Sequence, residues 1–533
     1  MALFLLSFFP LFLLIFLLGI VKIPARYSTF ISLISAIIIA ALFFNQNLFL
    51  ISMGLFEGIA FTLWPMLIVL FAALFSYNFI IETKRIDTIK KIIISFSEEK
   101  SVLILILVWG FGNLLEGIAG YGTPVIIPAA ILITLGFNPF FSAFICLLGN
   151  TVPSAYGAVG IPAITLSIVA DLDPNIASAF IASHLLLITI IIPFILVLLT
   201  EKSFKKALRY LPETLAASLG FSISYFLVAF FLGPELPIIV SSLVVIALVT
   251  VISSFRKKTK KINRSYPLQE NSAEQKSSSC CAPVSSYEII NAFSLYFFIL
   301  IFITLVSPLF PVIKNCLDSF NSSIKFYPGD EGKTITFYWI TNPGVLILLA
   351  VAVVAFIDIL KKKKLTPVFS VSLTKTIKTI IPSAILLMLL VSFATIMRYS
   401  GMIKILAEQT AVFTGFLYPV FAPAIGALGA FITGTSISSC ILFGEFQKNV
   451  ALNLGINEYW ITSANLVGAT VGKIMAPYNI AVALTTVGLL GQESKLLRKT
   501  FYFCIAFLSI LGIITFFLSD ISDTIVSIVT SGL

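Results

Sequence analysis

Charged side chains are scarce in this chain of 533 residues: 11% are Asp, Glu, Lys or Arg, whereas 59% are hydrophobic. A water-soluble protein of this length needs far more charge on its surface, so the composition excludes a soluble enzyme or a soluble binding module. The mean hydropathy of +1.08 is likewise far above globular values. The sequence therefore predicts a polytopic membrane protein whose main partner is the lipid bilayer.

Histidine and cysteine are also rare, with one His and six Cys in the chain. There is no paired His and Cys, no phosphate-binding loop and no zinc-ligand spacing, which argues against an enzyme and predicts neither a cofactor nor a metal site. Cys280 and Cys281 are adjacent in a polar stretch without further ligands nearby, and no disulfide framework is indicated. The N-terminal sequence MALFLLSFFP lacks the basic residues of a cleavable signal peptide, so we expect a retained first helix.

Long apolar runs alternate with short basic gaps. The runs lie at 2–20, 27–44, 54–80, 177–200, 212–231, 237–254, 289–308, 335–359 and 500–518. Each approaches the roughly 20 residues that a helix needs to cross a bilayer. The basic gaps lie at 84–91, 202–209, 256–264, 361–364 and 495–499. The positive-inside rule places these gaps in the cytoplasm of a bacterium, so we expect a multi-pass inner-membrane (plasma-membrane) protein with both termini outside. Topology thus explains the net charge of +10, and no nucleic-acid partner is expected.

Two regions, 113–162 and 433–479, interrupt the apolar pattern with Gly, Pro and small polar residues. Backbone that leaves a helix inside a bilayer is tolerated only where it is buried in protein or lines a watery cavity. Half-helix N-termini in such segments suit an anionic substrate group. We therefore expect both regions to line a substrate path near the middle of the membrane.

The two regions also resemble each other. Asn150 precedes Pro162 by twelve positions, as Asn465 precedes Pro477, and Gly122-Thr123 recurs as Gly434-Thr435. The helix after the first region ends at a basic gap, whereas the helix after the second begins at one. This pattern predicts an all-α fold of about 12 to 14 transmembrane helices, with broken or re-entrant segments in two inverted-topology repeats and transport by alternating access.

These features divide the chain into five parts. They are N-terminal transmembrane helices (1–100), a first repeat core with the helices that follow it (101–254), a basic cytoplasmic linker (255–287), connecting helices (288–379), and a second repeat core with the C-terminal helix (380–533).

Ionisable residues at membrane depth are functional candidates, because a charge there is costly unless it is paired or hydrated. Glu116 and Lys473 are the strongest candidates for substrate binding or coupling; alternatively, they pair with each other or cap helices. His184 is either a proton relay or a packing residue on an apolar helix. Weaker candidates are Glu57 and Glu445, which could be interface groups, and Arg398, which is expected to snorkel. The hydroxyls of Thr435, Ser436, Ser438 and Ser439 would either bind a carboxylate or hydroxyl of the substrate or serve helix packing.

Four motifs in this order resemble the L-lactate permease family. They are LEGIAGYGTP at 115–124, Asn150 with Gly157-Ala158, Gly434-Thr435 with Leu442-Phe443, and Gly472-Lys473 with Pro477 and 480–482. Glu493 and 496–498 resemble the closing motif of the family. The resemblance covers about residues 54–518.

The resemblance implies a secondary transporter that imports small 2-hydroxy monocarboxylates, such as lactate and glycolate, together with protons. The polar motif residues of the family correspond to Glu116, Thr123, Asn150, Asn465 and Lys473. We assign Lys473 and the half-helix N-termini to the carboxylate, and Glu116 to the proton. The sequence departs from the family pattern at Ile437, Cys440, Ala476 and Tyr478, within the expected site, which bears on the anion that is accepted.

Two other functions are compatible with the same helices. One is a sodium-coupled carrier or antiporter for another small organic anion, which acidic residues at the midplane would favour. The other is a non-transporting sensor or assembly subunit, which is disfavoured because the longest polar stretch, 256–287, is too short for an output domain.

Overall fold

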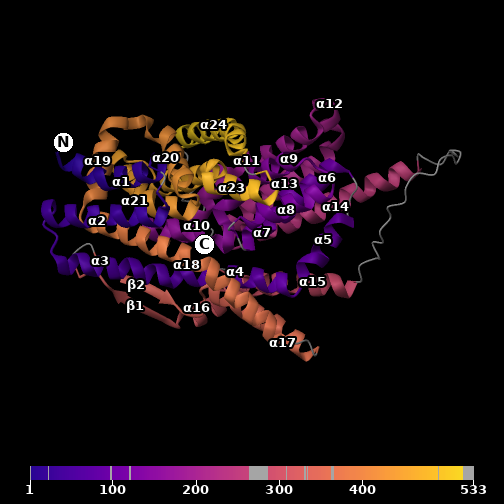
Figure 1. Ribbon diagram of the computed structural model, residues 1–533, viewed down its shortest axis with the longest axis horizontal. Coiled ribbons are helices and arrows are strands. Elements are labelled where there is room, and N and C mark those ends of the chain that lie inside the picture. Colours follow the sequence, from indigo (N-terminus) through magenta and orange to yellow (C-terminus); the bar gives the residue numbers. More distant parts are fainter. Residues whose placement is uncertain are drawn as a thin grey trace.

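The computed structural model describes residues 2–21, 23–95, 99–118, 120, 122–262, 286–307, 309–328, 332, 334–361, 365–489 and 491–519. Cys280 and Cys281 lie outside the described residues. Within these ranges the chain is helical apart from one β-hairpin and connecting turns (Figure 1).

Twelve helices of the described ranges are long and apolar enough to cross a membrane, or thirteen if the bent pair Glu458–Met475 and Pro477–Thr486 is one span. The bend between the members of that pair is 46°. The predicted all-α polytopic fold of 12 to 14 helices is therefore confirmed. The first predicted run forms α1 (Ala2–Gly19), one of the shorter apolar helices.

The N-terminal helices and two later helices form one packed group. Its members are α2 (Ala25–Phe43), α3 (Leu48–Phe61), the π-helical turn η1 (Thr62–Leu67), α4 (Ile68–Glu82), α17 (Pro343–Leu360) and α18 (Thr366–Tyr399). The long helix α18 packs against α2, α3 and α4, and α17 packs against α4. In Figure 1, α3, α4 and α18 extend along the lower part of the molecule.

A buried ion pair connects this group to α5 (Arg85–Ser95) and α15 (Ser286–Leu305). Arg85 Nη2 lies 2.7 Å from Asp358 Oδ2 of α17, and Arg85 Nε donates a hydrogen bond to the carbonyl oxygen of Asn291 in α15 at 3.0 Å. Both charged side chains are almost fully buried. Arg85, which the sequence suggested only as a topology signal, therefore also joins three helices.

The first region of broken helices consists of short helical elements that follow one another along the chain. It comprises α6 (Lys100–Ile104), the π-helical η2 (Leu105–Gly112), α7 (Asn113–Ile118), α8 (Thr123–Thr134), α9 (Pro139–Gly149), η3 (Pro153–Tyr156), α10 (Gly157–Ala170) and α11 (Pro174–Glu201). The second region comprises α20 (Tyr418–Thr433), α21 (Ser436–Leu454), α22 (Glu458–Gly472), η6 (Lys473–Met475), α23 (Pro477–Thr486) and α24 (Glu493–Phe517).

The two broken regions have similar turns at corresponding positions. Gly122 and Gly434 each adopt a positive φ, 81° and 82°, between a helix and its successor. Further on, Asn138 caps α9 by accepting a hydrogen bond from Phe141 N, and Asn457 caps α22 by accepting one from Trp460 N. Each region therefore contains a helical hairpin followed by a second break.

The two hairpin turns lie at opposite ends of α11. Lys100 Nζ is 5.6 Å from the Phe137 ring in the α8–α9 turn, and the neighbouring Ser101 donates a hydrogen bond to Glu201, the last residue of α11. At the α21–α22 turn, the Tyr459 hydroxyl accepts a hydrogen bond from the backbone of Asp173, which caps the start of α11. Because α11 has 28 residues, its ends are about 42 Å apart.

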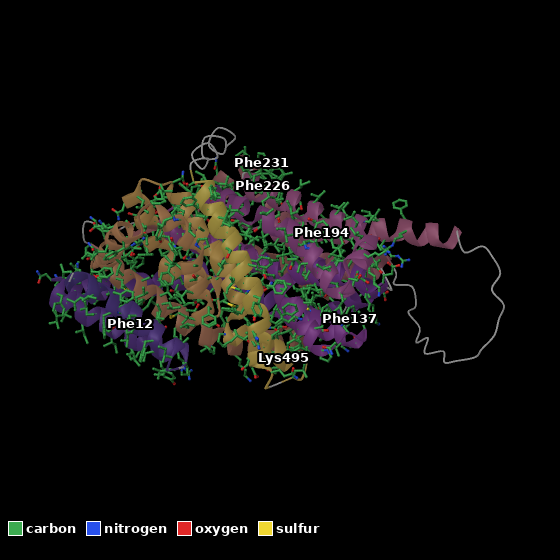
Figure 2. The ribbon with its side chains drawn as sticks, turned by 90° about the horizontal axis from the view of Figure 1, so that it is seen from above. Phe12, Phe137, Phe194, Phe226, Phe231 and Lys495 are labelled. Carbon is green, nitrogen blue, oxygen red and sulfur yellow. The ribbon has the colours of Figure 1, made fainter. Side chains whose placement is uncertain are left out.

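The basic start of α24 lies on the same side of the molecule as the α8–α9 turn. Lys495 Nζ is 4.8 Å from the Phe140 ring, and Lys499 Nζ is 3.9 Å from the Phe144 ring. Figure 2 shows Phe137 and Lys495 near one edge of the molecule and Phe231 at the opposite edge.

The remaining elements connect these groups. They are α12 (Phe204–Ala207), η4 (Leu208–Tyr210), α13 (Leu211–Phe231), α14 (Pro237–Ile262), α16 (Pro311–Asp318), β1 (Asn321–Lys325), β2 (Thr334–Tyr338), α19 (Met402–Thr414) and η5 (Gly415–Leu417). The strands pair antiparallel, with Ser323 opposite Thr336.

One sequence prediction was wrong at its boundary. The apolar run 335–359 begins in β2, because the alternating Thr-Ile-Thr-Phe-Tyr segment pairs with β1, and its helix starts only at Pro343 behind the Asn342 cap. The helix α14 continues to Ile262, into the stretch that the sequence analysis assigns to the linker, and the Arg256 side chain pairs with Glu213 of α13 at 3.2 Å.

The positions of the two hairpin turns can be tested with single cysteines at exposed sites, Thr134→Cys and Asn453→Cys, in a background with Cys280, Cys281 and Cys316 replaced by Ser. We expect a membrane-impermeant maleimide to label Asn453→Cys in intact cells and Thr134→Cys only after permeabilisation. Labelling of both variants from the same side would contradict the opposite placement.

Candidate functional site

A lysine and a glutamate from the two broken regions meet inside the protein. Lys473 follows α22 at the start of η6, and Glu116 lies in α7. Their Nζ and Oε1 atoms are 2.9 Å apart, and the Glu116 side chain is only 3% exposed. A charge buried this deeply requires a partner, so the pair holds α7 and η6 together.

Two asparagines complete the surroundings of Lys473. Lys473 Nζ donates to Asn150 Oδ1 at 3.4 Å, and Asn150 caps the end of α9 at the second break of the first region. Asn479 Nδ2 donates to the carbonyl oxygens of Gly434 and Lys473, at 3.0 and 2.9 Å. Asn479 thereby bridges both breaks of the second region. Asn479 was not among the site residues predicted from the sequence, although an amide two residues after a proline in a broken helix was a usable signal.

A cavity of about 60 Å³ adjoins this pair. It is lined by Glu116, Gly120, Gly122, Ser154, Gly157, Ala158, Pro162, Gly434, Thr435, Ser436, Ile437, Lys473, Tyr478 and Asn479. The lining comes from both broken regions. On a volume scale where one water needs roughly 10–15 Å³, the cavity admits a few waters or one small solute. We call it the inner cavity.

Three buried polar atoms at or beside the inner cavity have no hydrogen-bond partner in the described protein: Glu116 Oε2, Asn150 Nδ2 and Ser436 Oγ. A buried donor or acceptor without a partner is costly. These atoms therefore offer one carboxylate oxygen, one amide donor and one hydroxyl for a polar ligand beside the lysine ammonium.

The hydroxyls of Thr123, Thr435 and Ser438 stabilise the breaks. Thr123 Oγ1 donates to the carbonyl oxygen of Gly120 at 2.8 Å. Thr435 Oγ1 caps α21 by accepting from Ser438 N at 3.1 Å and donates to Ser438 Oγ at 2.8 Å. Of the predicted hydroxyl cluster, Thr435 and Ser436 line the inner cavity.

Ser439, Asn465 and His184 lie elsewhere. Ser439 Oγ donates to the Gly426 carbonyl oxygen, and Asn465 Nδ2 donates to the Ser439 carbonyl oxygen, so both residues join α20, α21 and α22. His184 is fully buried, stacks on Trp460 with ring centroids 3.6 Å apart, and shares a hydrogen bond between Nδ1 and the Phe180 carbonyl oxygen. None of the three lines the inner cavity.

Among the described residues, no group of three or more His, Cys, Asp or Glu side chains lies close enough together to hold a metal ion.

A polytopic helical fold with broken helices around a buried ion pair is typical of a membrane transporter. The particular family is shown by comparison: the model of the L-lactate permease family matches residues 3–522, and the chain belongs to that family. The family is one of permeases, not of enzymes.

Curated relatives of this family align with the chain over most of their length. An L-lactate permease of Streptococcus iniae is 35% identical, with 86% of this chain and 93% of the relative aligned. Glycolate permease GlcA of Escherichia coli K12 is 30% identical (93% and 92%), and an L-lactate permease of Bacillus subtilis is 30% identical (90% and 89%). Among solved structures, the Alcanivorax borkumensis YdaH transporter aligns at 13% identity and a TM-score of 0.32, covering 79% of this chain and 86% of that one.

The glycine at the start of α10 allows a direct test of the site. A Cβ atom at Gly157 would lie 2.6 Å from Glu116 Oε1, whereas its φ of −61° and ψ of 154° suit alanine. We expect Gly157→Ala to displace the Glu116 carboxylate and reduce lactate uptake by about tenfold to a hundredfold, without loss of folded protein.

Gly220→Ala is the matched control, because its Cβ would lie 2.6 Å from the flexible end of Leu248, between α13 and α14. Normal uptake by Gly157→Ala would show that the position of Glu116 is unimportant.

Proposed function

We propose that this protein imports small 2-hydroxy monocarboxylates, such as lactate and glycolate, by proton symport across the bacterial inner membrane. The observation that carries the proposal is the buried contact between Lys473 and Glu116 beside the inner cavity. The printed names of the relatives support the class of substrate.

The ion pair couples the anion to the proton. While Glu116 is ionised, its carboxylate pairs with the ammonium group of Lys473 and repels a second carboxylate. A proton on Glu116 releases Lys473, and the substrate carboxylate can then take its place. The pocket therefore binds one proton and one anion together, and the net charge of the occupied site equals that of the empty site.

The unpartnered groups suit the substrate. Asn150 Nδ2 can donate to the carboxylate beside Lys473, and Ser436 Oγ can bond the 2-hydroxyl group. The half-helix N-terminus of α21 adds a partial positive charge, since Thr435 and Ser436 begin that helix at the cavity. A small cavity with these groups favours short hydroxy acids over longer carboxylates.

The hairpin turns suggest how the site is opened to each side. The α8–α9 turn and the α21–α22 turn lie at opposite ends of α11, as expected for two repeats inserted with opposite orientations. We infer that the hairpins alternately open the inner cavity to the cytoplasm, which the basic side faces, and to the outside.

Uptake of labelled L-lactate into liposomes that contain the purified protein tests the function. We expect accumulation under an inward proton gradient and none under a sodium gradient. In Glu116→Gln, the neutral amide imitates protonated glutamate, so lactate exchange should persist while proton-driven accumulation falls by about tenfold or more.

Lys473→Met should abolish both uptake and exchange, because it removes the anion-binding charge. Glu408→Gln and Lys404→Met, both exposed on α19, serve as charge-matched controls and should transport normally. Accumulation driven by sodium, or proton-driven accumulation that survives in Glu116→Gln, would refute proton symport through this pair.

A further inference from the structure

A second and larger cavity of about 390 Å³ lies nearer the start of α11. Asp171 and Pro174 at the α10–α11 turn line it, together with Thr336 of β2 and Trp64 of η1. We call it the outer cavity, because it lies at the end of α11 that is remote from the basic gaps. Its volume is typical of ligand-binding pockets.

The outer cavity lies beyond the inner cavity along the same two helices, α10 and α21. The inner cavity is bounded by Pro162 of α10 and Ile437 of α21. The outer cavity is bounded by Ile168 of α10 and Ile441 of α21, one to two helical turns further along the same two helices. The helices α10 and α21 are packed against each other over this length.

A cation–carboxylate pair lies in the outer cavity, as one does in the inner cavity. Arg398 Nε, near the end of α18, is 2.6 Å from Glu445 Oε2 of α21, and Arg398 Nη2 donates to the Val169 carbonyl oxygen of α10 at 2.6 Å. The two side chains are 17% and 19% exposed. Arg398 therefore does not simply extend toward the membrane surface, as the sequence suggested; it faces a cavity and binds both helices.

We propose that the outer cavity is a second carboxylate-binding site, at which Arg398 holds the substrate anion before it moves along the α10–α21 seam to Lys473. A guanidinium group binds a carboxylate through two parallel hydrogen bonds, which suits it to this task. The inference rests on the proposed function, because the anion is the same at both sites.

Glu445 competes with the substrate at this outer site. Its carboxylate is paired with Arg398, so a substrate carboxylate must displace it to reach the guanidinium group. The cavity is also lined by the carboxyl groups of Glu57, Asp171 and Glu235. The Tyr399 hydroxyl donates to Glu57 at 2.5 Å.

Glu235 lies in the turn before α14, and burial raises its pKa to about 7. Below that pH Glu235 is neutral, so acidification reduces the negative charge that would repel an anion. On α21, Lys448 Nζ donates to the Asp171 carbonyl oxygen and pairs with Glu458 at 3.3 Å, which anchors the rim of the cavity. The outer site should therefore bind an anion more tightly in acid than near neutral pH, because protonated Glu235 no longer repels it.

Equilibrium binding of labelled L-lactate to the purified full-length protein, at pH 5.5 and pH 7.5, tests this proposal. We expect two lactates per protein at pH 5.5, one in Arg398→Met and one in Lys473→Met. We expect Glu445→Gln to bind lactate at the outer site about tenfold more tightly at pH 7.5 than the unmodified protein, because Arg398 is already free.

The Glu445→Gln result guards against misfolding, since a damaged protein would not gain affinity. Lys404→Met, on the exposed face of α19, should keep both sites. A single site in the unmodified protein, lost in Lys473→Met and kept in Arg398→Met, would overturn the outer site and leave the proposed function intact. No lactate bound by any form would overturn both.

Discussion

A carboxylate buried among membrane helices is stable only beside a counter-charge, and in this protein Lys473 supplies it at 2.9 Å from Glu116. The two residues come from separate broken regions of the chain, 357 positions apart. Their contact therefore determines how α7, α9 and η6 meet, with Asn150 as a third partner. The breaks in these helices are tolerated because Asn479 and Thr435 satisfy backbone groups that would otherwise face the bilayer interior.

The same contact explains why an anion and a proton should travel together. When a proton neutralises the carboxylate of a buried ion pair, the cation is left without a counter-charge. This is strongly unfavourable unless another anion takes the place of the carboxylate. In the proposed symport the substrate carboxylate is that replacement, so neither ion would be favoured at the site alone. Arg398 and Glu445 repeat this arrangement with a residue from α18 and one from α21. Two such pairs in series would give the anion a cationic partner at each end of the path.

Much of the architecture could be predicted from sequence, because bilayer-length apolar runs and basic gaps follow directly from the solvent. Glu116 and Lys473 were also predictable, since charges flanked by glycine at membrane depth are rare. The remote pairings were not: no local pattern indicates that Arg85 contacts Asp358, that Asn479 bridges Gly434 and Lys473, or that Ser439 and Asn465 serve packing between helices. His184 was ambiguous for the same reason, because only the fold reveals Trp460 against its ring.

The most direct test of the central claim is the number of protons taken up when lactate binds to purified protein in weakly buffered solution, followed with a pH indicator. Measurements on the unmodified protein and on Glu116→Gln isolate the proton that Glu116 binds. We predict that proton uptake at saturating lactate is smaller by one proton per protein in the variant, while lactate still binds at Lys473. Equal proton uptake by both forms, or lactate binding without any proton uptake, would contradict coupling through this ion pair.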